Sequence, residues 1–177
     1  MEIRTNVTET GEIYGKWNIA KDTWCITDRW NNFAYLLIGS EKAMLIDTCS
    51  GEGNVREIVE QITDKEIMVV NTHGHFDHIW GSRKLRELSG AKIYACEEEK
   101  NVCEDVVNNV SEQAGRAYTV KPNHYLKDGE EITIAGMTCK LIATPGHTIG
   151  SCCYYFEEDG ILISGDTLFQ ESVGRTD

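Results

Sequence analysis

The chain has 177 residues, of which 41% are hydrophobic and 26% are charged, and these values predict one soluble globular domain over residues 1–177. The net charge of −12, from 17 basic and 29 acidic residues, argues against a partner held by phosphate neutralisation, so no nucleic-acid binding is expected. No apolar window of about 18 residues could span a membrane. Met1–Thr5 also lacks the apolar region of a signal peptide, so we predict a cytoplasmic protein without membrane contact.

The chain contains seven cysteines, which is an odd number, and no two of them form a CxxC pair. This spacing excludes a zinc finger and a thioredoxin-type motif. In a reducing compartment we expect most of them to be free thiols that pack as small apolar residues.

The N-terminal third is predicted to be β-rich, with strands over residues 16–27, 33–39 and 42–48. The Gly- and Ser-containing segment that follows interrupts this pattern. Apolar residues at helical spacing then predict a helix over 55–62, and the apolar run 66–70 predicts a buried strand.

Further along, the sequence predicts a second helix over residues 79–88, a short strand over 91–95 and an acidic helix over 97–113. Two hairpins are expected over 131–144 and 151–164, turning at Gly136 and Gly160 respectively. The order β-rich, βα, βα, β-rich favours sheets packed on each other with helices outside, an α/β fold.

The most informative segment is Thr-His-Gly-His-Phe-Asp-His at residues 72–78. It directly follows the predicted strand over 66–70, so its side chains would be held by a rigid frame and face a crevice. Imidazole and carboxylate groups hold zinc, iron or manganese in open, reactive geometries. We therefore predict a metal site.

Two later strand ends supply further ligand-type residues. His147 lies in Thr-Pro-Gly-His-Thr at 144–148, and Asp166 follows the apolar run 161–164. We predict two adjacent metal sites: His73, His75 and His147 for the first ion, Asp77 and His78 for the second, and Asp166 between them. Such metals lower the pKa of bound water to about 7, and the hydroxide would attack an acyl carbonyl.

Asp77 is also a candidate for proton transfer to or from the reacting groups. Asp47, at the end of the predicted strand over 42–48, could orient the histidine segment or merely form a turn. His124 has no neighbouring ligand and is expected to be a surface residue.

At these residues the chain resembles the metallo-β-lactamase superfamily and, within it, the hydroxyacylglutathione hydrolase (glyoxalase II) branch. The resemblance rests on His-Gly-His-Phe-Asp-His at 73–78, Thr-Pro-Gly-His-Thr at 144–148, Gly-Asp-Thr-Leu-Phe at 165–169 and Leu-Ile-Asp-Thr at 45–48. It implies an αββα sandwich with one or two metal ions, zinc above all with iron or manganese as alternatives, and the same ligand residues.

The chain departs from the family pattern in its last part. In the family the fold continues and a later histidine completes the second metal site, whereas no histidine follows His147 here. The resemblance therefore implies a sandwich without its final strands and helix, and a weak or empty second site. Glutathione-binding residues of the thioester hydrolases also lie largely beyond this region.

Three functions follow from the resemblance. The first is a metal-dependent hydrolase of a small acyl substrate, most of all a thioester. The second is a persulfide dioxygenase with a single iron on His73, His147 and Asp166, which resembles this chain at Gly-Arg-Thr-Asp, 174–177. The third is an inactive or truncated metal-binding fragment. The oligomeric state is left open, with a homodimer as one option.

Overall fold

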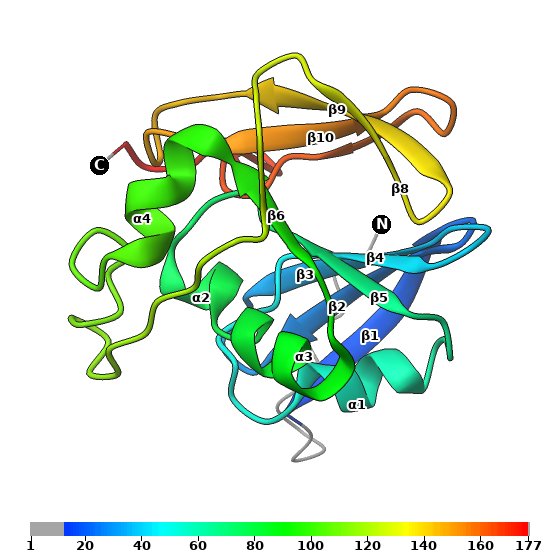
Figure 1. Ribbon diagram of the computed structural model, residues 1–177, viewed down its shortest axis with the longest axis horizontal. Coiled ribbons are helices and arrows are strands. Elements are labelled where there is room, and N and C mark those ends of the chain that lie inside the picture. Colours follow the sequence, from blue (N-terminus) through cyan, green and yellow to red (C-terminus); the bar gives the residue numbers. More distant parts are fainter. Residues whose placement is uncertain (1–12, 177) are drawn as a thin grey trace.

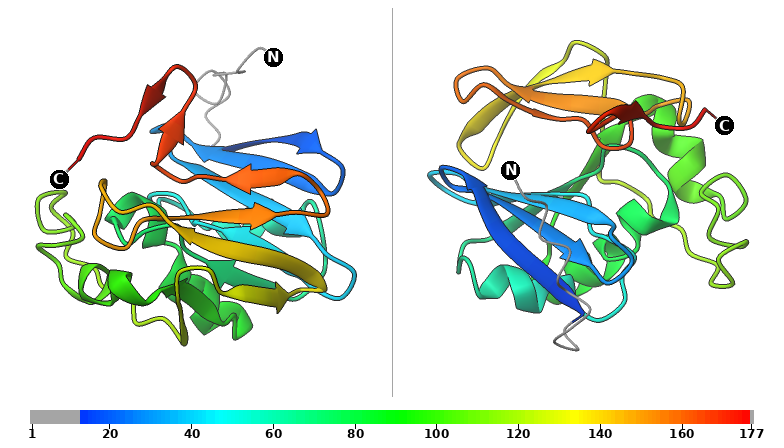
Figure 2. Two further views of the ribbon diagram at one scale, coloured as in Figure 1. Left: turned by 90° about the horizontal axis from the view of Figure 1, so that it is seen from above. Right: turned by 180° about the vertical axis from the view of Figure 1, so that it is seen from behind.

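The computed structural model describes residues 13–176, which form two large β-sheets stacked on each other (Figures 1 and 2). The first sheet has seven strands in the order β1 to β7, and the second has four in the order β11-β10-β9-β8. Helices cover the far face of the first sheet. The described residues thus supply three layers of an αββα sandwich, which is the predicted fold class.

The first sheet changes from antiparallel to parallel at its centre. Strands β1 to β4 pair antiparallel, whereas β4 to β7 pair parallel. Its strands are β1 (Tyr14–Ala20), β2 (Thr23–Asp28), β3 (Phe33–Ile38), β4 (Ala43–Ile46), β5 (Ile67–Val70), β6 (Ile93–Cys96) and β7 (His124–Leu126). The carboxyl ends of the parallel strands therefore meet at one edge of the sheet.

Parallel strands need crossover connections, and these carry the helices. Between β4 and β5 lies α1 (Val55–Glu60), and between β5 and β6 lie α2 (Phe76–Ile79) and α3 (Ser82–Ser89). The third crossover begins with the 3-10 turn η2 (Glu97–Glu99) and α4 (Lys100–Glu104).

The second sheet confirms the two predicted hairpins. One consists of β8 (Glu131–Ile134) and β9 (Met137–Ala143), and the other of β10 (Cys152–Phe156) and β11 (Ile161–Ile163). The small hairpin of β12 (Leu168–Phe169) and β13 (Ser172–Val173) follows. The sequence did not predict this hairpin, because two-residue strands carry no readable periodicity.

The two faces of the first sheet pack against two separate apolar clusters. Successive side chains of one strand point to opposite faces, so each strand contributes to both clusters. Leu36 and Leu45 belong to the apolar cluster on the helix side, whereas Leu37 and Met44 belong to the cluster between the sheets. From the second sheet, the fully buried Phe156 fills the space between the sheets.

The predicted strand over 16–27 is in fact the hairpin β1-β2. The chain turns at Asp22, whose φ of 52° lies in the left-handed region that aspartate tolerates better than most residues. The predicted helix over 79–88 begins earlier and breaks at Gly81. A Cβ on Gly81 would lie 2.9 Å from Cβ of Thr48, so the break lets the chain pass close to the end of β4.

The predicted acidic helix over 97–113 ends at Glu104. The carboxylate of Asp105 accepts hydrogen bonds from the backbone N–H groups of Val107 and Asn108, both at 2.9 Å. These bonds form a turn in place of the next helical turn, which is a common effect of aspartate.

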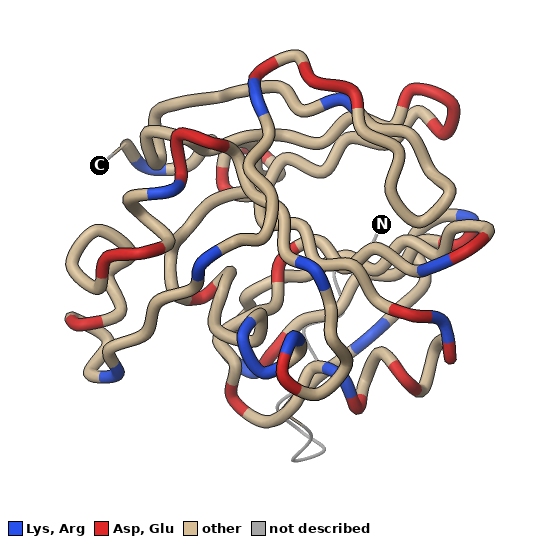
Figure 3. The backbone as a smooth tube through the Cα atoms, viewed as in Figure 1, with Lys and Arg blue, Asp and Glu red and all other residues tan. Residues whose placement is uncertain are grey.

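Acidic and basic residues are scattered along the backbone (Figure 3). All seven cysteines are buried free thiols, as expected. Among residues 13–176, no helix is both long and apolar enough to cross a bilayer.

Phe156→Ala should lower the free energy of unfolding by about 3–5 kcal/mol, because it leaves a cavity between the sheets. The matched control is Leu162→Ala on the neighbouring strand β11, where the side chain is 45% exposed and the expected loss is below about 1 kcal/mol. Urea denaturation measures both. Equal losses would contradict the assignment of Phe156 to the core.

Candidate metal centre

The histidine segment leaves the first sheet at the carboxyl end of β5. Residues 71–75 run along the sheet edge, and α2 begins at Phe76. His73, His75 and His78 are all buried, although imidazole rings are costly to bury unless they have polar partners. Their burial side by side therefore indicates a site with a specific use for them.

The turn after β9 brings His147 to the same place. Its Nε2 atom lies 3.0 Å from Nδ1 of His75, and its ring centroid lies 4.7 Å from that of His73. One nitrogen from each of the three rings falls within 4.8 Å of the others, which is close enough to share one ion. The structure thus brings together the three residues predicted to hold the first metal.

Asp166, after β11, lies between this group and His78. One carboxylate oxygen is 3.4 Å from Nε2 of His78, and the other is 3.6 Å from Nε2 of His147. A second set of atoms that could hold an ion comprises His73, His78 and Asp166. The carboxylate thus faces a ligand of each predicted site.

Asp77 differs from the other predicted ligands. It is half-buried on α2 and, together with Asp166, lines two cavities of about 560 and 490 Å³. Within the described part of the chain, neither candidate ligand group includes it. Its roles as a ligand and in proton transfer stay predictions.

The electrostatics of the cluster vary from ring to ring. Burial, together with the charges of the neighbouring histidines, lowers the pKa of His73. Burial also disfavours the charged form of His78, but the charge and hydrogen bond of Asp47, with Asp77 and Asp166, outweigh it and raise the pKa to about 9. For Asp166, burial raises the pKa, and the charges of His78 and His147 oppose this.

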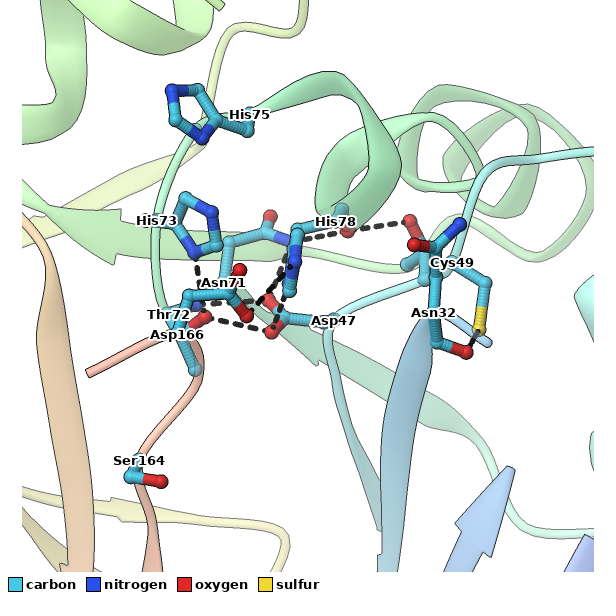
Figure 4. A network of polar contacts seen from close by, with 12 residues as sticks. Asn32, Asp47, Cys49, Asn71, Thr72, His73, His75, His78, Ser164 and Asp166 are labelled. Carbon is cyan, nitrogen blue, oxygen red and sulfur yellow. Dashed lines mark hydrogen bonds and ion pairs between the residues drawn. The ribbon is translucent and has the colours of Figure 1, made fainter. Parts of the chain in front are cut away.

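Asp47 is a buried carboxylate that orients the histidine segment (Figure 4). It accepts hydrogen bonds from the backbone N–H of Thr72 at 2.9 Å and the Thr72 hydroxyl at 2.7 Å. Its Oδ2 atom also lies 2.9 Å from Nδ1 of His78. When His78 carries its proton on Nδ1, its Nε2 lone pair points toward Asp166 and is available to a metal. The structure therefore favours the orienting role for Asp47 over a simple turn role.

His147 is oriented by the last part of the described chain. Its Nδ1 atom lies 3.1 Å from the backbone carbonyl of Arg175, which suits donation from Nδ1 and leaves Nε2 as the ligand atom. The preceding residue, Gly174, lets this segment pass close to Asp166, because a Cβ on Gly174 would lie 1.8 Å from the carbonyl oxygen of Asp166.

Glu99 joins the two ligand-bearing loops and was not predicted from the sequence. Its fully buried carboxylate accepts hydrogen bonds from the backbone N–H of Gly74 at 2.6 Å, the N–H of Gly150 at 2.7 Å and the hydroxyl of Thr148. Burial raises its pKa, and these donors oppose the shift. In sequence it is one of three consecutive glutamates, so only its burial distinguishes it.

His124, the remaining histidine, lies on β7, where it is exposed and stacks on Tyr94 with ring centroids 4.6 Å apart. Neither candidate ligand group contains it. Its placement agrees with the predicted surface role.

The donor set suits a divalent metal ion. Nε2 of His73 is buried and has no hydrogen-bond partner among the described residues, and such an orphaned atom is costly unless something else satisfies it. Four imidazole rings beside one carboxylate match the nitrogen and oxygen ligands of zinc, iron or manganese. The residues therefore fit a divalent metal ion of this group.

Comparison with known proteins agrees with this geometry. The sequence model of the metallo-beta-lactamase superfamily matches residues 27–177. The chain belongs to this superfamily. The match includes the first sheet from β3 onward, the whole second sheet and all of the candidate ligands.

Two relatives and one solved structure give the likeness in detail. A probable metallo-hydrolase, YqgX of Bacillus subtilis, is 34% identical over 147 residues, 81% of this chain and 69% of the relative. A hydroxyacylglutathione hydrolase of Francisella philomiragia is 32% identical over 152 residues, 85% of this chain and 53% of the relative. The solved structure of BLEG-1, a B3 metallo-beta-lactamase, has a TM-score of 0.73 and 30% identity, and the match covers 93% of this chain and 77% of that one.

The chain therefore spans only about half the length of the hydroxyacylglutathione hydrolase that it matches. The superfamily match over residues 27–177 includes the ligand-bearing strand ends. What it establishes for this chain is a fold of the superfamily with a histidine-rich metal site.

His73→Ala and His147→Ala should each abolish metal uptake, because each removes one of the three nitrogens that converge on one point. Metal analysis of the purified protein by atomic spectroscopy measures this. His124→Ala is the matched control and should retain the wild-type metal content. Unchanged metal content in either ligand variant would contradict the assignment.

Glu99→Ala should lower the free energy of unfolding by about 3 kcal/mol or more, because it leaves buried donors of two loops without an acceptor. Zinc affinity should also fall by about 10–100-fold, since these loops carry His75 and His147. The control is Glu97→Ala, an exposed glutamate two residues away, which should change stability by less than about 0.5 kcal/mol. Denaturation and zinc titration measure the two effects, and equal behaviour of the variants would exclude a joining role.

Proposed function

We propose that this chain catalyses the metal-dependent hydrolysis of a small acyl compound, with a thioester as the first candidate. The proposal rests on the position of Asp166, whose two carboxylate oxygens face His78 and His147 and which lines two cavities. Ligands that converge at a cavity leave room for a substrate beside the metal. The likeness to a hydroxyacylglutathione hydrolase supports a thioester.

A metal held by these residues supplies a Lewis acid and lowers the pKa of a water molecule to about 7. The protein's own groups then fix the geometry. Asp47 and the Arg175 carbonyl hold the rings of His78 and His147 in one orientation each. Because these rings are held before a substrate arrives, little reorganisation is needed during the reaction.

Asp77 is the proposed proton carrier. It borders both cavities beside Asp166 and is only half-buried, so its carboxylate can reach a water molecule or a leaving group there. It would accept a proton from the attacking water and return it to the sulfur atom of the leaving thiolate. A general base of this kind contributes roughly 10²–10⁴-fold to a rate.

The zinc-loaded protein should hydrolyse thioesters in a panel that contains a hydroxyacyl thioester of glutathione, a simple thioester, a lactone and a persulfide. Asp77→Ala should lower kcat by about 100-fold or more. Its matched control is Asp159→Ala, an exposed aspartate in the β10-β11 turn, which should retain the wild-type kcat. A spectrophotometric thiol assay measures the rates.

The alternative is the iron-dependent persulfide dioxygenase. One observation favours it: Gly174 and Arg175, in the segment that resembles those enzymes, lie against Asp166 and His147. One iron per chain after purification without added metal, together with sulfur-dependent oxygen uptake and no thioester hydrolysis, would overturn the hydrolase proposal. Zinc-dependent thioester hydrolysis without oxygen uptake would exclude the alternative.

A further inference from the structure

A large aromatic cavity opens beside the metal centre, between the antiparallel part of the first sheet and the β12-β13 hairpin. Its volume is about 560 Å³, within the usual range for pockets that hold small molecules. Asp47, His78 and Asp166 line one end of it, so the cavity begins at the ligands. Its apolar walls consist of Trp17, Ile19, Phe33, Tyr35, Leu168 and Phe169.

The strand register explains the aromatic wall. Trp17 on β1 pairs with Cys25 on β2, and Cys25 pairs with Tyr35 on β3. Residues paired across antiparallel strands point to the same face, so these three side chains form one row. Leu168 and Phe169 face the cavity from the hairpin, which Figure 2 shows standing apart from the two larger sheets. The wall is thus built by sheet pairing rather than by a loop.

Away from the predicted metal ligands, the described part of the chain offers no positive charge to an anion in this aromatic cavity. Among the described residues that line it there is no lysine or arginine, and the charged groups are the carboxylates of Asp47, Asp77 and Asp166 beside His78. An anionic group would find no cation there that the predicted metal site does not already use, whereas an uncharged apolar group would exclude water from the aromatic surface.

The opposite side of the metal centre has a different character. A cavity of about 650 Å³ borders His75 and His147 there, and Arg175 and Asn108 are among its lining residues. An arginine with amide side chains suits a polar or carboxylate-bearing group. The two sides of the site therefore differ in polarity.

We propose that the aromatic cavity binds the acyl chain of a thioester whose acyl group is uncharged and apolar. The polar, anionic thiol then lies on the Arg175 side. In the reaction, the oxygen atom of water bonds to the carbonyl carbon, the carbon–sulfur bond breaks, and one proton of the water passes to the thiolate sulfur. This assignment rests on the proposed hydrolase function and specifies its substrate class.

Acetyl, butanoyl and hexanoyl thioesters of one thiol test the proposal. For the wild-type zinc protein, kcat/KM should rise about fourfold for each added methylene that the cavity buries. Trp17→Ala and Leu168→Ala should both flatten this dependence. Leu162→Ala is the matched control, because Leu162 is 45% exposed and Leu168 51% exposed, yet only Leu168 lines the cavity. Leu162→Ala should keep the wild-type dependence, and melting temperatures report whether each variant is folded.

Binding of uncharged amides separates this inference from the proposed function. Hexanamide should bind more tightly than acetamide in calorimetric titration of the wild-type protein, and Trp17→Ala should remove the difference. This test is independent of turnover, so it decides the cavity's role even if no thioester is hydrolysed. Equal binding of the two amides would overturn the acyl-chain assignment. Thioester hydrolysis with no dependence on chain length would also overturn it, but would still support the proposed thioesterase function.

Discussion

The buried carboxylate of Asp47 is the interaction on which the metal centre depends. Burying a charge costs several kcal/mol unless donors surround it, and here Thr72 and His78 supply them. Asp47 takes a left-handed backbone conformation with φ of 61°, which directs the chain away at the end of β4. One side chain thereby joins the ends of β4 and β5 to helix α2.

The sheets bring the remaining ligands to this point. The carboxyl ends of β4 and β5 lie at one edge of the first sheet because the two strands are parallel. His147 and Asp166 follow β9 and β11 of the second sheet. The apolar layer between the sheets therefore also sets the distance between the two halves of the metal site. Glu99 also links the two halves of the site. Its carboxylate accepts hydrogen bonds from the backbone N–H groups of Gly74 and Gly150, one in each ligand-bearing loop.

Much of the architecture could be predicted from local patterns. The strands over 33–38, 43–46 and 67–70 and the two later hairpins agree with their apolar patterns to within one or two residues. Two of the errors have different causes, one a contact distant in sequence and the other a local turn. Gly81 breaks a helical pattern because Thr48 lies against it, and the turn at Asp105 ends an acidic helix whose composition alone favoured continuation.

The sequence by itself determined the kind of site, because histidines and aspartates at strand ends have few uses other than metal binding. It also determined the α/β fold class through the order of its apolar segments. Only the tertiary structure decided that Asp166 faces both His78 and His147, that Glu99 and not its neighbours is buried, and that an aromatic cavity opens beside the ligands. The reason is physical. Burial, hydrogen bonding and cavity shape depend on contacts between segments distant in sequence, and local periodicity does not predict which segments will be in contact.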